Sequence, residues 1–300
     1  MVKRLCGIAV ALTCVGRPSL PAQQNFDTVQ VRAIPVAGSV YVLMGSGGNI
    51  GLSVGPDAAF LVDDQFAPLT PKIVAAVREI TERSIRFVLN THWHGDHTGG
   101  NENLGKAGAL IVAHENVRVR MSTDQFLEAF NRTVPASPAG ALPVVTFTDA
   151  VTFHLNDDEI HAFHVPPAHT DGDAVVHFRR ANVVHMGDVY VNGGYPFIDR
   201  SSGGSIDGLI GAVARALELV DGATKVIPGH GQVSDGTGLE RYHDMLVAIR
   251  DRVAQEIASG KTRDEVIAAK PTAAFDEAWG RGSRTGDQFA TAVYDSLVER

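Results

Sequence analysis

The feature that most constrains this 300-residue chain is the stretch Thr91-His92-Trp93-His94-Gly95-Asp96-His97, which places three histidines and an aspartate within six residues. It follows an apolar run, residues 85–89, that is typical of a buried strand. Polar side chains gathered at the end of a buried strand are well placed to form a functional site. Imidazole nitrogens and carboxylate oxygens suit Zn²⁺. The alternate spacing of positions 92, 94 and 96, with the adjacent pair 96 and 97, would let one short loop serve two metal ions.

Three later segments repeat this arrangement on a smaller scale. Residues 166–172, 186–189 and 227–231 each place one histidine or aspartate beside glycine or proline, just beyond an apolar strand. A dinuclear site needs such distant residues to complete the coordination of each ion. The candidate metal ligands are therefore His92, His94, Asp96, His97, His169, Asp188 and His230.

The order of the predicted elements indicates the fold class. Short β-rich segments occupy residues 29–62, and a helix (71–83), a strand (85–89) and a further helix (115–131) follow them. A second β-rich stretch covers residues 144–186, and helices of period 3.6 follow over 206–220 and 239–257. Thr262 and Glu265 have the spacing of a capping box that opens one more helix. Two sheets with helices outside fit this pattern better than one doubly wound sheet or a barrel.

The first 22 residues have the pattern of a secretory signal peptide. Lys3 and Arg4 precede a twelve-residue apolar run, and a segment of small residues and prolines ends at Ala22, where we expect cleavage. The apolar run is too short to span a bilayer, which takes about 20 residues. We therefore expect a periplasmic or secreted protein with no stable membrane insertion after cleavage; an uncleaved N-terminal anchor is the alternative.

Removal of this segment changes the composition of the chain. Both cysteines, Cys6 and Cys14, would leave, so that only histidine and carboxylate could hold a metal. Three basic residues and no acid would leave with them, so the net charge would change from −8 to −11. Such an acidic protein is a poor match for a nucleic-acid backbone, and we expect a small-molecule substrate. The oligomeric state cannot be predicted from these features.

The motifs at positions 91–101, 166–172, 186–189 and 227–231 resemble those of the metallo-β-lactamase superfamily, in the order of that family. The resemblance implies an αββα sandwich of two mixed sheets with outer helices, formed by residues 23–300. It also implies two zinc ions per chain: His92, His94 and His169 would hold the first, Asp96, His97 and His230 the second, and Asp188 would bridge them. Asp63 resembles a family aspartate that contacts a ligand histidine without binding metal.

A zinc pair of this kind lowers the pKa of a bound water and polarises a carbonyl, which favours hydrolysis. We expect a zinc hydrolase that opens β-lactam rings by attack of metal-bound hydroxide and so confers antibiotic resistance, with Asp96 orienting the hydroxide. The ligand set more closely resembles that of glyoxalase II and the lactonases, so an exported lactone, ester or thioester hydrolase is the main alternative. An iron-dependent oxidoreductase of the same fold is a second one.

Residues 193–199 follow Asp188 closely and contain two aromatic residues. We predict that Tyr195 and Phe197 line the substrate pocket. Some β-lactamases hold the substrate carboxylate with a lysine a few residues after the ligand at the position of Asp188; this chain has none there, and Arg200 is the nearest cation that could replace it. Trp93, between two candidate ligands, is expected to pack in the core.

Overall fold

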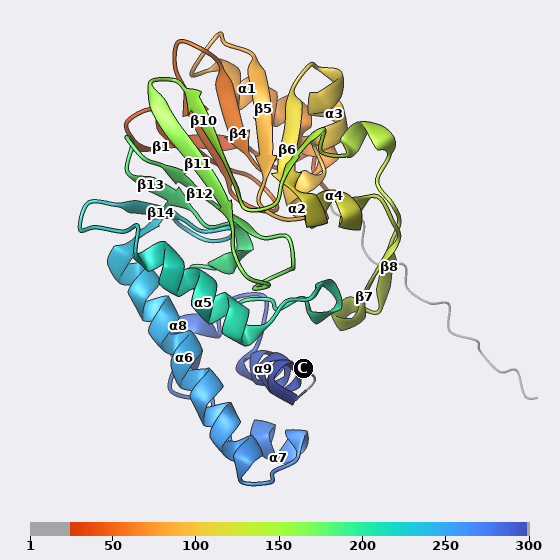
Figure 1. Cartoon of the computed structure of the whole chain (residues 1–300), viewed down its shortest axis with the longest axis vertical. Coiled ribbons are helices and arrows are strands. Elements are labelled where there is room, and N and C mark those ends of the chain that lie inside the picture. Colours follow the sequence, from red (N-terminus) through yellow and green to blue (C-terminus); the bar gives the residue numbers. More distant parts are fainter. Residues whose placement is uncertain (1–24, 299–300) are drawn as a thin grey trace, which may run out of the picture.

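The computed structural model describes residues 25–298, so the predicted signal peptide lies outside the described residues. Two mixed β-sheets pack face to face, and helices cover their outer faces (Figure 1). This arrangement confirms the predicted α/β class and the αββα sandwich. Among the described residues, no helix has the length and apolar character needed to cross a membrane.

The first sheet carries the ligand-rich loop. In spatial order its strands are β1 (Arg32–Ala37), β2 (Val40–Met44), β3 (Ile50–Val54), β4 (Ala59–Val62), β5 (Ile85–Asn90), β6 (Leu110–His114) and β9 (Val145–Phe147). The strands from β1 to β4 are antiparallel neighbours, whereas β4, β5, β6 and β9 run parallel. Helices α1 (Thr70–Arg78) and α3 (Asn101–Lys106) bury Ile73, Val77 and Leu104 against its outer face.

The second sheet supplies the other site residues. Its strands, in spatial order, are β10 (Ala150–Leu155), β11 (Asp158–His164), β12 (Ala174–Phe178), β13 (Val183–His185), β14 (Lys225–Ile227) and β15 (Ser234–Asp235). Neighbours are antiparallel except β13 and β14. Helices α5 (Ile206–Leu217), α6 (Gly236–Ala258) and α9 (Gly286–Val298) cover its outer face (Figure 1).

The remaining elements are short. They are the one-turn helix α2 (Gly95–Thr98), the helices α4 (Glu115–Met121), α7 (Arg263–Ala268) and α8 (Asp276–Trp279), and a two-stranded hairpin of β7 (Gln125–Leu127) and β8 (Arg132–Val134). The capping box predicted at Thr262 and Glu265 is present at the start of α7.

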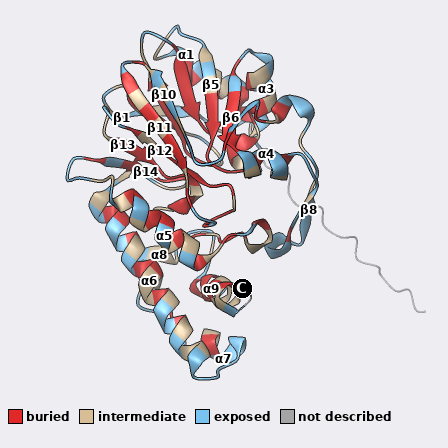
Figure 2. Cartoon of the chain, viewed as in Figure 1, coloured by how far each residue is buried: buried red, intermediate tan, exposed pale blue. Residues whose placement is uncertain are grey.

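The core lies between the sheets and beneath the helices. Most strand residues are buried, whereas the outward faces of α6 and α7 are exposed (Figure 2). Phe60 of β4 and Phe153 of β10 meet edge to face at 4.9 Å between ring centres, so the two sheets contact each other directly. Aromatic pairs in this geometry stabilise a core by about 0.5–1.5 kcal/mol beyond their buried area.

The structure corrects three sequence predictions. Helix α1 ends at Arg78 and not at residue 83. The helix predicted over 115–131 ends at Met121, because the hydroxyls of Ser122 and Thr123 donate to the carbonyl of Val119 and compete with the helical hydrogen bonds. The chain then forms the β7–β8 hairpin. Strand β9, grouped by sequence with the second β-rich stretch, pairs with β6 at the edge of the first sheet.

Candidate metal centre

The first group of candidate ligands lies on the short segment after β5. The chain bends after β5, His94 has an extended backbone as the N-cap of α2, and the chain then enters that single helical turn. Asp96 and His97 therefore lie in the helix, and His92 and His94 lie before it. This bend followed by a helical turn brings four potential ligands of one segment to the same edge of the sandwich.

The second group comes from the other sheet. His169 follows β11 in a loop that Asp173 holds by accepting the backbone N–H groups of His169 (2.7 Å) and Thr170 (2.8 Å). Asp188 lies in a single 3₁₀ turn after β13, Gly187–Val189. His230 follows β14 and pairs through an isolated bridge with Val191. Strand ends of both sheets thus meet at one site.

The first donor set consists of His92, His94 and His169, whose ligand atoms all lie within 4.8 Å of one another. His94 Nδ1 and His169 Nε2 are 2.9 Å apart. The Oδ2 atom of Asp188 completes this set, at 3.6 Å from His169 Nε2 and 3.9 Å from His92 Nε2.

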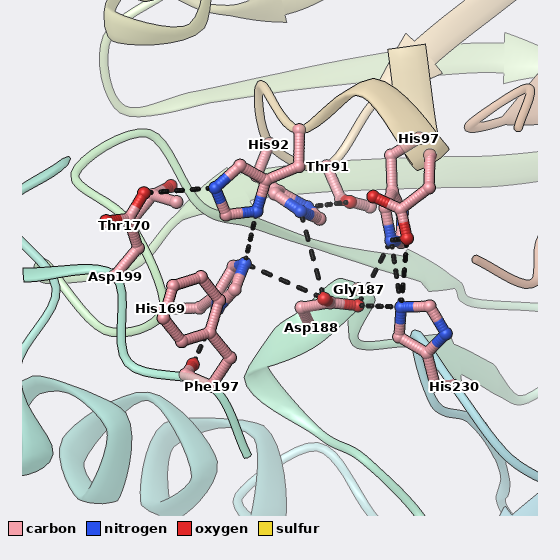
Figure 3. Close-up of polar contacts among 12 residues, drawn as sticks. Thr91, His92, His97, His169, Thr170, Gly187, Asp188, Phe197, Asp199 and His230 are labelled. Atoms are coloured by element: carbon pink, nitrogen blue, oxygen red, sulfur yellow. Dashed lines mark hydrogen bonds and ion pairs between the residues drawn. The ribbon is translucent and has the colours of Figure 1, made fainter. Parts of the chain in front are cut away.

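The second donor set consists of Asp96, His97 and His230. The Nε2 atoms of His97 and His230 are 3.4 Å apart. Asp96 Oδ2 lies 3.3 Å from His230 Nε2, and Asp188 Oδ1 lies 3.2 Å from His97 Nε2 and 3.3 Å from His230 Nε2. One oxygen of Asp188 therefore faces each set, with the carboxylate between His169 and His230 (Figure 3).

These residues fit a pair of metal ions. His92 Nε2 is buried without a hydrogen-bond partner among the described residues, although buried polar atoms are normally satisfied. It lies inside the first donor set, where a cation would satisfy it. Nitrogen and oxygen donors without sulfur favour Zn²⁺ or another divalent first-row metal. The clusters are thus consistent with a dinuclear metal site.

A second layer of contacts fixes the ligand histidines. Asp63 Oδ2 accepts from His97 Nδ1 at 2.7 Å, as the sequence comparison implied, and Asp199 Oδ2 accepts from His94 Nε2 at 3.0 Å. The carbonyl of Phe197 accepts from His169 Nδ1 at 2.7 Å. Each contact leaves the opposite ring nitrogen facing the donor set, which is the usual way that proteins orient metal-binding histidines.

The glycine-rich turn between β2 and β3 packs directly against a ligand. A Cβ atom at Gly48 would lie 2.1 Å from the His97 ring, so a side chain here would displace that ring. The backbone N–H of Gly48 donates to the carbonyl of Asp96 at 3.1 Å, and Gln65 Nε2 donates to the Gly48 carbonyl at 2.7 Å. This turn supports the ligand segment.

In the metal-free protein, protons bound to histidine nitrogens supply part of the positive charge that metal ions would bring. Asp188 raises the pKa of His230 to about 10 against the effect of burial. Burial also opposes the charged form of His97, but the carboxylates of Asp188, Asp96 and Asp63 raise its pKa well above the ordinary value. Burial would raise the pKa of Asp96, yet His97 and His230 lower it to about 2. The second donor set is therefore a cluster of ionised carboxylates around imidazolium groups.

The first donor set is different. Burial lowers the pKa of His92 well below its ordinary value and that of His169 to about 4. Both rings are therefore neutral at pH 7, which is the form that binds metal.

The donor sets open into a cavity of about 760 Å³. Asp96, Asp188 and His230 are among its lining residues, and the β7–β8 hairpin contributes Phe130 and Arg132. Of the predicted pocket residues, Phe197 lines the cavity and stacks on His94 with ring centres 5.9 Å apart.

Tyr195 also borders the cavity, but its hydroxyl donates to Asp276 at 2.8 Å and its ring stacks on Phe289. Arg200 is not among the residues that line it, because its side chain extends toward Asp295 of α9, 3.7 Å away. Trp93 is 4% exposed and packs in the core, as predicted, and it also borders the cavity.

The sequence analysis missed Asp199, Phe130, Arg132 and Arg284. Asp199 is only two residues beyond Phe197, so its segment was identified but its contact with His94 was not. Arg284 lines the cavity from a glycine- and serine-rich segment before α9, where no local pattern indicated a site. Its role depends on tertiary contacts alone.

Comparisons with known proteins agree with this geometry. The model of the metallo-beta-lactamase superfamily matches residues 43–277. Hydroxyacylglutathione hydrolase of Nitrosococcus oceani is 28% identical over 164 residues, which cover 53% of this chain and 54% of that protein. The chain thus spans about half the length of this curated relative.

Two solved structures share the fold. A metallo-beta-lactamase from Pontibacter korlensis superposes with a TM-score of 0.60 at 18% identity, over 72% of this chain and 99% of that one. The sec-alkylsulfatase Pisa1 from Pseudomonas sp. superposes with a TM-score of 0.68 at 15% identity, over 89% of this chain and 50% of that one. Since the family model covers most of the chain and both donor sets lie within it, this chain belongs to the metallo-β-lactamase superfamily.

Proposed function

We propose that this chain is an exported, metal-dependent hydrolase of acyl bonds and that its substrate is a β-lactam amide. The observation that carries the proposal is the carboxylate of Asp188, which presents one oxygen to each donor set at the end of an open cavity. The predicted signal peptide and the likeness to β-lactamase structures support the choice of a β-lactam.

Divalent metal ions in these sets would supply a Lewis acid and a water molecule that ionises near neutral pH. His92, His94 and His169 would hold one ion, and Asp96, His97 and His230 the other, with Asp188 between them. No cysteine or activated serine appears at the site among the described residues, so the geometry favours direct attack by water without an acyl-enzyme.

Asp96 is the residue placed to handle the proton. Its side chain is 29% exposed and lines the cavity, whereas Asp63 is fully buried behind His97. A carboxylate oxygen of Asp96 that faces the cavity could orient the attacking water and accept its proton. Phe197 and Phe130 add aromatic rings to the wall of this cavity.

The test is the initial rate of hydrolysis of a chromogenic cephalosporin by the zinc-loaded chain without residues 1–22, with Asp96→Ala as the background. A kcat/KM above about 10⁴ M⁻¹s⁻¹ that disappears on chelation would establish a β-lactamase. A rate equal to that of the variant would reject the β-lactam but leave the metal site in place.

A second candidate is a lactone, ester or thioester hydrolase. One support for it is the composition of the donor sets: Asp188 faces both of them, and His97 belongs to the second. The other is the similarity to a hydroxyacylglutathione hydrolase. Assay of the same preparation with S-acyl glutathione and with aryl ester and lactone substrates would distinguish it. Activity on these with none on the cephalosporin would replace the β-lactam assignment.

A further inference from the structure

A second cavity, of about 230 Å³, lies on the outer face of the second sheet and shares no lining residue with the cavity at the donor sets. Phe163 at its floor packs beneath the helices, whereas the neighbouring Ala162 packs between the sheets. The lining residues come from β11, β12 and the C-terminal end of α5: His161, Phe163, His177, Arg179, Arg215, Glu218 and Leu219. Four of these side chains are basic, although the whole chain carries a net charge of −8.

Two of the basic residues are histidines on neighbouring strands. His161 and His177 are direct partners in the antiparallel pairing of β11 and β12, so their side chains leave the same face of the sheet next to each other. His161 Nδ1 lies 2.8 Å from Thr152 Oγ1, which leaves Nε2 of that ring for a ligand. Burial and then the charge of Arg179 lower the pKa of both rings, and Arg215 lowers that of His161 further. An anion in this cavity would offset the positive charge.

The two arginines can both donate to such an anion. The Cζ atom of Arg215 lies 4.3 Å from the centre of the Phe163 ring, and Nη1 donates to the carbonyl of His164 at 3.0 Å. Neither contact supplies negative charge, and Arg215 has no carboxylate partner among the residues that the structure describes. Arg179 pairs with Glu159 at 2.9 Å in a solvent-exposed contact. Such exposed pairs contribute little free energy, so Arg179 can exchange this partner for a bound anion.

Glu218 determines which anion fits. It is the only carboxylate that lines this cavity, and its side chain has no hydrogen bond or ion pair with any residue in the described part of the chain. An ionised carboxylate only accepts hydrogen bonds, so it repels an anion that carries no proton. Hydrogen phosphate has a P–OH group that can donate to this carboxylate, whereas sulfate has no proton at neutral pH. The tetrahedral oxygens of phosphate also suit donors that come from two strands and a helix.

We propose that this cavity is a binding site for inorganic phosphate. Arg179 and Arg215 donate to the phosphate oxygens through charge-assisted hydrogen bonds, and Glu218 accepts from the P–OH group. The rings of His161 and His177 offer further N–H donors from the floor of the cavity. The inference goes beyond the proposed hydrolysis, because neither a candidate metal ligand nor a residue of the first cavity takes part.

The test is a titration of the zinc-loaded protein with phosphate at pH 8, followed by the NMR signals of the histidine rings, with sulfate and chloride compared at equal ionic strength. We expect saturable shifts of His161 and His177, and phosphate should bind at least about tenfold more tightly than sulfate. Arg215→Ala should weaken phosphate binding about 10- to 100-fold, and Arg215→Lys should restore part of it. Glu218→Gln should weaken phosphate, strengthen sulfate and so remove most of the preference.

Arg180→Ala is the matched control, because it removes the same charge at an exposed position next to Arg179 that does not line this cavity. Phosphate affinity should stay within about twofold of that of the intact chain. Equal weakening in Arg180→Ala and Arg215→Ala would show that phosphate responds only to the net charge and would overturn the proposal. Shifts confined to the histidines of the donor sets, or equal affinity for sulfate, would also overturn it. Since binding is measured, these outcomes are independent of whether the protein hydrolyses a β-lactam.

Discussion

His94 is the candidate ligand whose orientation depends on a residue far along the chain. Its Nε2 atom donates to Asp199, 105 positions later, while Nδ1 faces the first donor set. Without that acceptor the ring could rotate, or take the tautomer with a proton on Nδ1, and each change would remove a ligand.

Asp199→Asn should therefore lower the affinity of the first metal by about 10- to 100-fold with little change of fold, as for other residues that orient metal ligands. Competition with a chromogenic chelator measures it. Asp221→Asn, at an exposed carboxylate far from the site, is the control. Equal metal affinity in both variants would show that Asp199 does not orient His94.

His230 is the most exposed histidine of the second set, with a 35% exposed side chain, and it contributes one ligand atom to that set. His230→Ala should reduce bound metal from two ions to about one per chain, as measured by elemental analysis after gel filtration, and should remove most hydrolysis. His154→Ala, at a side chain that is 74% exposed, should keep both ions. Two tightly bound ions in His230→Ala would refute the division into two sets.

The sequence indicated the candidate ligands because each follows a buried strand, and strand ends meet at one edge of a sheet. It did not indicate Arg284 or Asp199. Arg284 contacts Phe197 and Asp199 contacts His94, and in each pair the two residues lie far apart in sequence. Arg200 was chosen for its closeness to Asp188 along the chain, yet Asp295 of α9 attracts it away from the cavity. Proximity in sequence predicts contacts within one element and fails between elements.

At the scale of elements, the β7–β8 hairpin is the part of the cavity wall that belongs to neither large sheet. Its three-residue strands pair only with each other, and the turn between them places Asn131 in the left-handed region with φ of 45°. Phe130, just before this turn, is 56% exposed although it lines the cavity. Helical periodicity could not predict this hairpin, because side-chain hydroxyls end the preceding helix.

Phe130→Ala should raise KM for an aromatic or bicyclic substrate about tenfold, since about 1–2 kcal/mol of apolar contact would be lost, and should leave kcat nearly unchanged. Because the side chain is exposed, Tm should change little. Phe126→Ala removes a similarly exposed ring (51%) from the same hairpin at a position that does not line the cavity, and serves as the control. An equal effect of both substitutions on KM would indicate a general loosening of the hairpin.

At the scale of the whole molecule, the donor sets join the two halves of the sandwich. Ligand atoms from the segment after β5 meet those from the loops after β11, β13 and β14. Without metal, the protonation states of the same residues contribute to the free energy of unfolding. The stability of the metal-free protein should therefore depend on pH in a characteristic way.

Two groups of histidines act in opposite directions. The pKa of His169 and that of His185 are lowered by burial to about 4, so between pH 4 and 6.5 the unfolded chain binds more protons and stability rises with pH. The pKa of His230 is raised to about 10 by Asp188, and that of His97 is also raised, so above pH 6.5 the folded chain binds more protons and stability falls as pH rises.

The metal-free chain should consequently be most stable near pH 6.5 and lose stability on both sides. Urea unfolding with a chelator at pH 5, 6.5 and 9 measures this. The zinc-loaded chain should show no comparable loss toward pH 9, because metal replaces the protons on His97 and His230. A steady rise of metal-free stability from pH 5 to pH 9 would contradict the assignment of charged imidazoles to the second set.

The lining of the cavity at the donor sets comes from two kinds of segment, which has a consequence for how such a protein can change. The candidate metal ligands follow strands of the two large sheets, whereas Phe130, Arg132 and Arg284 come from the β7–β8 hairpin and from a loop outside both sheets. Substitutions at these three positions alter the cavity wall without replacing any candidate metal ligand. Libraries restricted to the hairpin and residues 282–284 should therefore yield new substrate preferences at high frequency, which makes this sandwich a promising scaffold for directed evolution.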